Sequence, residues 1–135
     1  MGNGRHSSTY GGNPLACAAA SVVLDTILGE ELVGRSRQMG DLIGERLNAV
    51  AAAPVVGDIR GCGSFWGVEF VHGRRAAEPA PAIAAAVRAR LVQAGVLTVN
   101  GGVHSNMVRL LPALNIDLDL LERALDEFVE AVRSE

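Results

Sequence analysis

The stretch Ile59–Phe70, IRGCGSFWGVEF, decides the fold. Its centre is a glycine turn, Gly61-Cys62-Gly63, and apolar residues precede it at Val55-Val56 and Ile59. The run that follows, residues 64–71, is rich in aromatic and β-branched side chains. Two such runs joined by a short glycine turn predict a pair of antiparallel strands.

Helical patterns precede this strand pair. Asn13-Pro14 predicts a helix start, because Asn is a good N-cap and Pro suits the first helical position. We expect this helix to reach Ile27 and to break or kink at Gly29. A second helical stretch over 30–52 ends before Pro54. Its expected apolar side comprises Leu32, Val33, Met39, Leu42, Ile43, Leu47 and Val50.

The remaining elements alternate between strand and helix. We expect a polar loop over 72–81, a helix over 81–94 closed by Gly95, a strand over 96–99, a Gly-rich loop over 100–106, a strand over 107–111, and a last helix starting at Asp117 or Asp119. The apolar face of that last helix comprises Leu120, Leu121, Leu125, Phe128, Val129 and Val132. The fold class is therefore α+β, with helices on one face of a small, mostly antiparallel sheet.

Composition narrows the function classes. The chain has 135 residues, 49% apolar and 20% charged, which indicates a globular protein. Its net charge of -3 argues against nucleic acid or an anionic membrane as a partner. It has no apolar run long enough to span a bilayer and no signal-peptide core, so we expect a cytoplasmic protein.

The cysteine, histidine and lysine content argues against disulfides, metal sites and a lysine Schiff base on this chain. Cys17 and Cys62 are too few for a disulfide framework or a thiolate zinc site, and we expect both to be buried free thiols. The three histidines, His6, His72 and His104, have no metal-ligand spacing, so no metal site is expected. All twelve basic residues are arginines, so Schiff-base chemistry on a lysine amine cannot run on this chain alone.

Two places are candidates for binding. The segment His6–Pro14 is rich in hydroxyls and glycines and runs into a helix N-terminus, which is typical of an anion site but also of an ordinary N-cap. Arg109 lies in an apolar strand and needs a partner, either a ligand carboxylate or an acid such as Asp117. Arg60 is expected to be structural and to bridge loops.

Three segments resemble the class III pyridoxal-phosphate-dependent aminotransferases, which include 4-aminobutyrate, ornithine and acetylornithine aminotransferases. His6–Ala20, HSSTYGGNPLACAAA, is similar to the family's H-x-[ST]-T-[FY]-x-G-N-P run. Ile59–Phe70 is similar to R-G-x-G-L-x-x-G-x-E, and Asn106–Ile116, NMVRLLPALNI, is similar to N-x-[IV]-R-[LF]-x-P-x-L-x-[IV]. The resemblance covers the whole chain but only the C-terminal third of a typical member.

The resemblance implies a fold and a domain division. Residues 14–135 would be the small C-terminal domain of a fold-type I pyridoxal-phosphate enzyme, and residues 1–13 would be the loop that contacts the cofactor phosphate. Thr9 would donate its hydroxyl to that phosphate across a dimer interface, and Ser8 is a second candidate. Arg109 would bind a carboxylate of the amino-acid substrate. The catalytic lysine would belong to a large domain that precedes this segment, so no catalytic residue is assigned here.

The resemblance also implies an activity, with alternatives. The complete enzyme would transfer an amino group from an amino acid or ω-amine to a 2-oxo acid, while this chain alone would be inactive. The chain could instead be a stand-alone, non-catalytic small domain that docks on a full-length relative, or a remnant. An aminomutase or epimerase would share the fold. Without a large domain or homologous subunit, we expect a marginally stable chain that self-associates or forms a homodimer.

Overall fold

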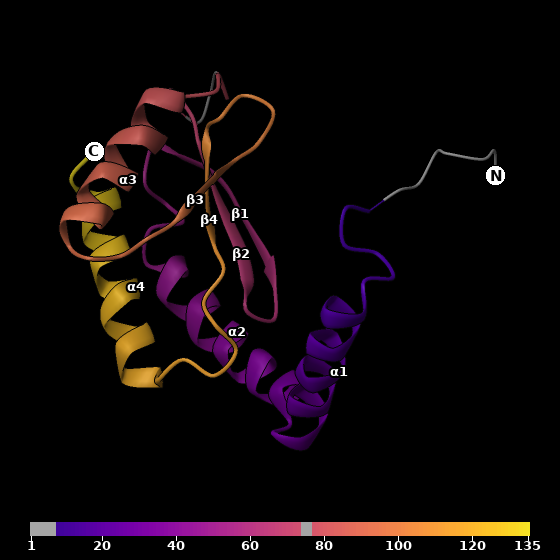
Figure 1. Cartoon of the computed structure of the whole chain (residues 1–135). Coiled ribbons are helices and arrows are strands. Elements are labelled where there is room, and N and C mark those ends of the chain that lie inside the picture. The colour runs from indigo at the N-terminus through magenta and orange to yellow at the C-terminus, as the bar shows by residue number, and fades with distance from the viewer. Residues whose placement is uncertain (1–7, 74–76) are drawn as a thin grey trace. The chain divides into compact units, whose positions relative to one another are not determined.

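The computed structural model describes residues 8–73 and 77–135 (Figure 1). The chain divides into two compact units, of which the first ends at Gly34 and the second is Arg35–Glu135. His6 and the start of the expected 1–13 loop lie outside the described residues. The boundary between the units falls inside the second helix, and the expected division at residues 13 and 14 stays a prediction.

Helix α1, Pro14–Gly29, begins as the sequence predicts. The side chain of Asn13 accepts hydrogen bonds from the backbone N–H groups of Leu15 and Ala16, and Pro14 occupies the first turn. The helix is rich in apolar residues, yet none of them is buried. Its exposed large apolar side chains are Leu15, Val22, Val23, Leu24 and Leu28.

The break after α1 occurs where the sequence predicts it, at Gly29. The residue with a left-handed backbone is Glu31, with a φ of 51°. Helix α2, Leu32–Asn48, then follows; it begins two residues after the start of the expected stretch 30–52 and ends four residues before its end. Its last turns tighten, because the N–H groups of Ala49 and Val50 bond to carbonyls three residues back.

The sheet is antiparallel throughout, in the order β1-β2-β4-β3. Strands β1 (Val56–Cys62) and β2 (Phe65–Phe70) form the hairpin expected around the glycine turn. Strand β4 (Met107–Leu110) pairs with β2 on one side and with β3 (Val99–Gly101) on the other. The expected α+β class with a small antiparallel sheet is therefore confirmed.

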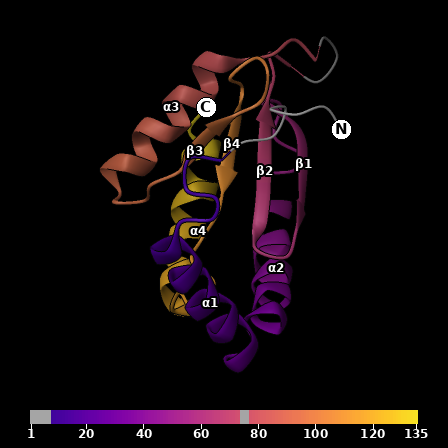
Figure 2. The ribbon, with the colours of Figure 1, turned by 45° about the vertical axis from the view of Figure 1, so that its right-hand side comes forward.

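The two remaining helices lie against each other on one face of the sheet, as Figure 2 shows. Helix α3, Pro81–Gln93, ends in a Schellman motif, in which Val96 N–H bonds to the Leu91 carbonyl and Gly95 has a φ of 80°. Helix α4, Leu118–Arg133, is capped by the Asp117 side chain. A single core joins α2, α3 and α4 to the inner face of the sheet. Its largest fully buried side chains include Met39, Ile43, Leu47, Phe70, Leu91 and Phe128.

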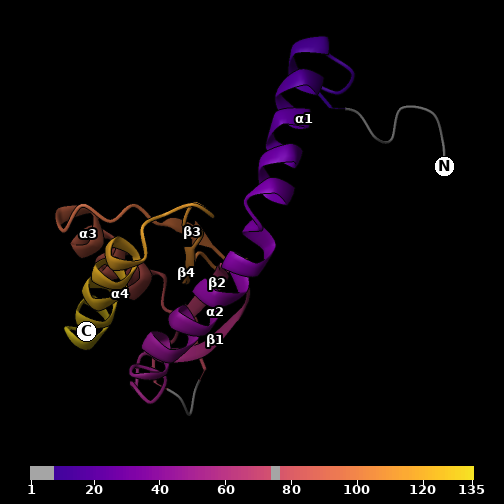
Figure 3. The ribbon, with the colours of Figure 1, turned by 90° about the horizontal axis from the view of Figure 1, so that it is seen from below.

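Helix α2 packs directly on the β1–β2 hairpin (Figure 3). A Cβ atom added at Gly40 would lie 2.5 Å from the Gly63 carbonyl oxygen, so the two backbones are in contact. Beside this contact, the Ser36 hydroxyl bonds to the Ser64 hydroxyl and accepts from the Ser64 N–H at 3.0 Å. Glycine at position 40 is required by this approach, whereas Gly34 has open space around it.

Trp66 fills the next layer between the helix and the hairpin. Its ring lies 3.0 Å from the position of a Cβ at Gly44 and 2.2 Å from that of a Cβ at Gly61. Its indole N–H donates to the Gly63 carbonyl at 2.8 Å, which satisfies the one polar atom of the side chain. Two glycines thus create the slot that holds the only tryptophan of the chain.

Several expectations for single residues are wrong. Cys17 and Cys62 are exposed, because α1 buries nothing and Cys62 lies opposite the exposed Phe65 at the sheet edge. Val33 and Leu120 are also about half exposed. The expected strand over 96–99 is shifted to 99–101, because Val96 closes helix α3 before pairing with β4 begins.

The contact between Gly40 and Gly63 predicts opposite effects for two alanine substitutions in the same helix. Gly40→Ala should lower the free energy of unfolding by about 1–3 kcal/mol, because the added methyl overlaps the Gly63 backbone. Gly34→Ala should raise it by about 0.5–1 kcal/mol, since only the flexibility of glycine is lost. Urea unfolding followed by circular dichroism measures both. Equal stability of the two variants would contradict the packing described.

Candidate functional site

The outer face of the sheet carries a group of charged side chains from three of its strands. Neighbouring strands place Arg60, Gly67 and Arg109 side by side in one row. The next row holds Asp58, Glu69 and Met107. None of the described helices of this unit packs on this face, since their buried residues contact the opposite one.

Among the described residues, no partner is found for the guanidinium of Arg109 on this face. Its side chain lies across Gly101 of β3, where an added Cβ would be 3.0 Å from Arg109 Cδ and 3.1 Å from Nε. The Nε atom is buried and has no hydrogen-bond acceptor among residues 8–73 and 77–135. A buried, unsatisfied donor on a cation is costly, so the site is suited to an incoming anion.

The sequence left Asp117 open as a partner of Arg109, and the structure assigns Asp117 another role. Its carboxylate accepts a hydrogen bond from the Leu120 N–H at 3.0 Å and caps α4. No ion pair of Arg109 occurs within the described parts of the chain. The acid expected to neutralise Arg109 is therefore engaged elsewhere.

Arg60 is structural, as expected, although it bridges strands rather than loops. It donates to Asp58 on its own strand and to Glu69 Oε2 at 3.1 Å on β2. These hydrogen bonds, first that to Asp58 and then that to Glu69, raise the pKa of the Arg60 guanidinium above its ordinary value. The three side chains form a charge cluster with both acids bound to one base.

Asn106 completes this cluster from the start of β4, where it is only 2% exposed. Its amide Nδ2 donates to Glu69 Oε1 at 3.3 Å and to the Phe70 carbonyl at 2.9 Å. Its backbone carbonyl accepts from Phe70 N–H at 2.7 Å, which extends the pairing of β2 and β4. Both oxygens of Glu69 are thus occupied, one by Asn106 and one by Arg60.

A hollow of about 320 Å³ lies on this face and contains both arginines. Its floor is mostly apolar or glycine, because Met107 leans over Gly67, where a Cβ would lie 2.9 Å from the Met107 sulfur. The remaining lining residues are Gly61, Cys62, Phe65 and Trp66. A small ligand here would meet a guanidinium beside an apolar surface, which suits a carboxylate on a short carbon chain.

The N–H groups at the start of α1 are already hydrogen-bonded within the chain. Asn13 accepts from the N–H groups of Leu15 and Ala16, and its own carbonyl accepts from Cys17 N–H at 2.9 Å. Because Pro14 has no N–H, the first turn of α1 has no free donor. Of the two readings that the sequence left open, the bonding of this turn matches the ordinary N-cap, and the exposed Ser8 and Thr9 remain as hydroxyl donors.

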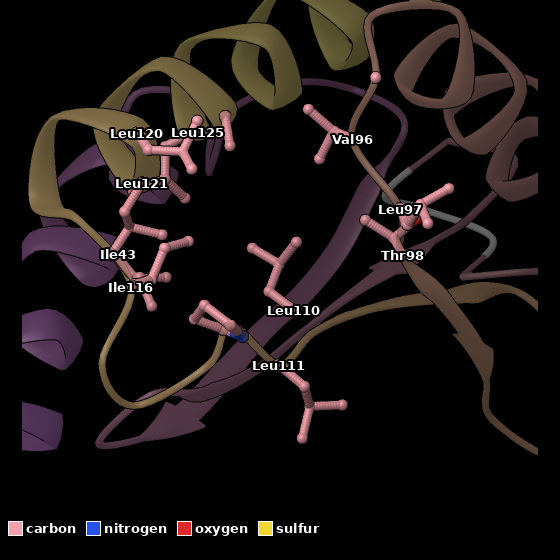
Figure 4. Close-up of a pocket in the computed structure, with 13 residues that line it drawn as sticks. Ile43, Val96, Leu97, Thr98, Leu110, Leu111, Ile116, Leu120, Leu121 and Leu125 are labelled. Atoms are coloured by element: carbon pink, nitrogen blue, oxygen red, sulfur yellow. The ribbon is translucent and has the colours of Figure 1, made fainter. Parts of the chain in front are cut away.

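A second hollow, of about 240 Å³, has no charged side chain in its lining. In Figure 4, Ile116, Leu120 and Leu121 lie on one side of it and Val96 on the other. Its wall is apolar apart from the hydroxyl of Thr98, whose buried Oγ1 has no partner among the described residues. The outer face of the sheet is therefore the stronger candidate site in this unit.

Within 8–73 and 77–135, no three His, Cys, Asp or Glu side chains come close enough together to hold a metal ion. No described helix combines the length and the apolar character needed to cross a bilayer.

Comparison with known proteins supplies the family. The sequence model described as aminotransferase class-III matches residues 1–132. The chain belongs to the class III aminotransferase family. It is 40% identical over 119 residues to 4-aminobutyrate aminotransferase of Mycobacterium leprae, covering 87% of this chain and 26% of that protein. It is 35% identical over 133 residues to mitochondrial acetylornithine aminotransferase of Saccharomyces cerevisiae, covering 97% of this chain and 29% of the relative.

A solved structure agrees with the sequence relatives. An aminotransferase of Bacillus anthracis superposes with a TM-score of 0.84 at 32% identity, covering 97% of this chain and 30% of that one. The class III aminotransferase segment described here thus spans between a quarter and a third of these relatives. The resemblance seen in the sequence is confirmed, and so is the expectation of a fragment of that fold.

The structure groups only some of the sequence-predicted site residues. Arg109 and Arg60 share one hollow in the second unit, while Ser8 and Thr9 belong to the first unit. Sequence reasoning missed the roles of Glu69 and Asn106 in this class III segment. The period-two spacing of Asp58 and Arg60 was a usable signal, because it places both on one face of a strand.

Proposed function

We propose that this chain is the C-terminal part of a pyridoxal-phosphate-dependent aminotransferase that moves an amino group from an amino acid or ω-amine to a 2-oxo acid. The family membership supports the reaction class. The observation that carries the proposal is the unpaired guanidinium of Arg109, whose buried Nε faces no acceptor among the described residues. Both substrates of such a reaction can carry a carboxylate that this group would bind.

The role of Arg109 is to hold and orient the substrate. A guanidinium offers two parallel N–H donors to a carboxylate, which fixes its orientation as well as its position. The apolar floor formed by Met107 and Phe65 leaves the carbon chain of the substrate in contact with apolar surface. Because Gly101 lies beneath Arg109, the side chain rests on backbone with no intervening side chain.

The cofactor would be pyridoxal 5'-phosphate, which supplies the electron sink for amino transfer when it is bound. The donors of this chain that fit its phosphate are the hydroxyls of Thr9 and Ser8, of which Thr9 is the stronger candidate by family resemblance. Both residues are exposed, and the helix N–H groups behind them are already bonded. The contact would therefore come from a hydroxyl rather than from the helix terminus.

Further protein must complete the site. The sequence contains no lysine, so the amine that holds the cofactor has to come from a large domain or a homologous subunit. The exposed apolar side chains of α1 support packing against such a partner, or self-association of the chain without one. The exposed free thiols of Cys17 and Cys62 fit the reducing cytoplasm as the location.

A second candidate is a non-catalytic small domain that docks on a full-length relative. The absence of lysine is equally consistent with such a docking domain and with a split or partial enzyme. An aminotransferase assay with added pyridoxal phosphate on the 135-residue chain, and on the product of the complete reading frame, separates the two. We expect no turnover by the chain alone and turnover by a product that includes a lysine-bearing large domain. An inactive complete product without that lysine would overturn the proposal.

Arg109→Ala tests the proposed carboxylate contact. In the complete enzyme it should raise KM for a carboxylate-bearing substrate about 10- to 100-fold, because a charge-assisted pair of hydrogen bonds is lost. Arg123→Ala, on the exposed face of α4, is the matched control and should leave KM unchanged. Unchanged KM and kcat in Arg109→Ala would show that Arg109 does not bind the substrate carboxylate.

Thr9→Ala tests the phosphate contact. It should weaken pyridoxal phosphate binding to the complete enzyme about 10-fold or more, because a hydrogen bond to a charged acceptor is lost. Ser8→Ala should have a smaller effect. Ser21→Ala, whose hydroxyl bonds to the Cys17 carbonyl within α1, serves as the control. Absorbance during cofactor dissociation measures all three, and equal affinities of Thr9→Ala and Ser21→Ala would exclude the role of Thr9.

A further inference from the structure

The unpaired state of Arg109 requires an explanation, because an acid lies within its reach. Glu69 faces Met107 across the β2–β4 pair, and Arg109 is two residues further along the same face. Diagonal neighbours of this kind lie about 7–8 Å apart, a distance that Glu and Arg side chains bridge easily. Glu69 is the natural ion-pair partner of Arg109, yet the two do not pair.

Glu69 is instead held on the far side of Met107. Its Oε2 accepts from Arg60 at 3.1 Å, and its Oε1 accepts from Asn106 Nδ2 at 3.3 Å. Asn106 is nearly fully buried and is fixed by its second bond to the Phe70 carbonyl, so it is a rigid anchor. The carboxylate therefore has a bonded partner at each oxygen and none of them is Arg109.

Two glycines, Gly67 and Gly101, make room for the side chains of Met107 and Arg109. Met107 lies over Gly67, the residue directly between Arg60 and Arg109 in the sheet. Arg109 lies over Gly101 on the other side. The Met107 side chain thus fills the space on the β2 side of Arg109, and the guanidinium is displaced toward β3.

We infer that Arg60 and Asn106 are positioning residues for Arg109. By binding the two oxygens of Glu69, they prevent that carboxylate from neutralising Arg109 and leave the guanidinium free for a carboxylate ligand. This inference rests on the proposed carboxylate contact of Arg109. Asp58 adds to the effect: it faces Glu69 across the β1–β2 pair, so without Arg60 the two like charges would push Glu69 toward β4.

Two double variants of equal net charge test the inference in the 135-residue chain. Arg60→Ala with Asp58→Asn removes one charge of each sign and frees Glu69. Arg60→Ala with Glu69→Gln removes the same charges but abolishes the competing carboxylate. Arg60 is about half exposed, so both proteins should fold. The probe is propionate at constant ionic strength, followed by NMR of the Arg109 Nε–H.

The first double variant should bind propionate about three- to tenfold more weakly than the unaltered chain, which is the range of a partly exposed ion pair. The second should bind it as well as the unaltered chain. A crystal structure of the first should place the Glu69 carboxylate within ion-pair distance of Arg109. Equal affinities of the two variants, or a Glu69 that stays on Asn106 in that crystal structure, would overturn the inference.

Arg109→Ala separates this inference from the proposed function. If Arg109→Ala binds propionate as well as the unaltered chain, the carboxylate contact itself fails, and the inference fails with it. If Arg109→Ala loses binding while the two double variants bind equally, the contact stands and the positioning role of Arg60 is wrong. Asn106→Ala should weaken binding in the same direction as the first double variant, without any change of charge.

Discussion

Helix α2 can lie on the β1–β2 hairpin only because Gly40 and Gly63 meet there without side chains. This contact fixes the hairpin turn against the helix, and the Ser36–Ser64 hydroxyl pair holds it from the side. Trp66, at the start of β2, then fits the slot between Gly44 and Gly61. Every neighbour of β2 in the sheet, including β4 with Arg109, takes its register from that strand.

The two faces of the sheet differ in the side chains that they carry. The inner face, together with α2, α3 and α4, forms the apolar core. The outer face carries an ion-pair cluster in which Arg60 and Asn106 occupy both oxygens of Glu69. Arg109 stands next to that cluster but outside it. Arg46, by contrast, pairs with Glu122, whereas the Arg109 Nε has no acceptor within the described residues.

Local rules predicted most of the fold. Asn13-Pro14 and Asp117 gave helix starts that the structure confirms, and the glycine turn predicted the hairpin. Properties set by tertiary contacts were not predictable. The helical pattern over 30–52 does not show that Gly40 and Gly44 make room for the hairpin and Trp66. Nothing in the sequence shows that Arg60 and Asn106 bind Glu69, the acid nearest to Arg109 in the sheet. Thr9 was singled out through the family motif.

The most direct test of the account is a crystal structure of the complete polypeptide with pyridoxal phosphate and a carboxylate-bearing substrate analogue. The account predicts the analogue's carboxylate about 3 Å from the Arg109 guanidinium nitrogens, with Glu69 still bonded to Arg60 and Asn106. A carboxylate held by residues outside this segment, with Arg109 paired to an acid, would contradict it.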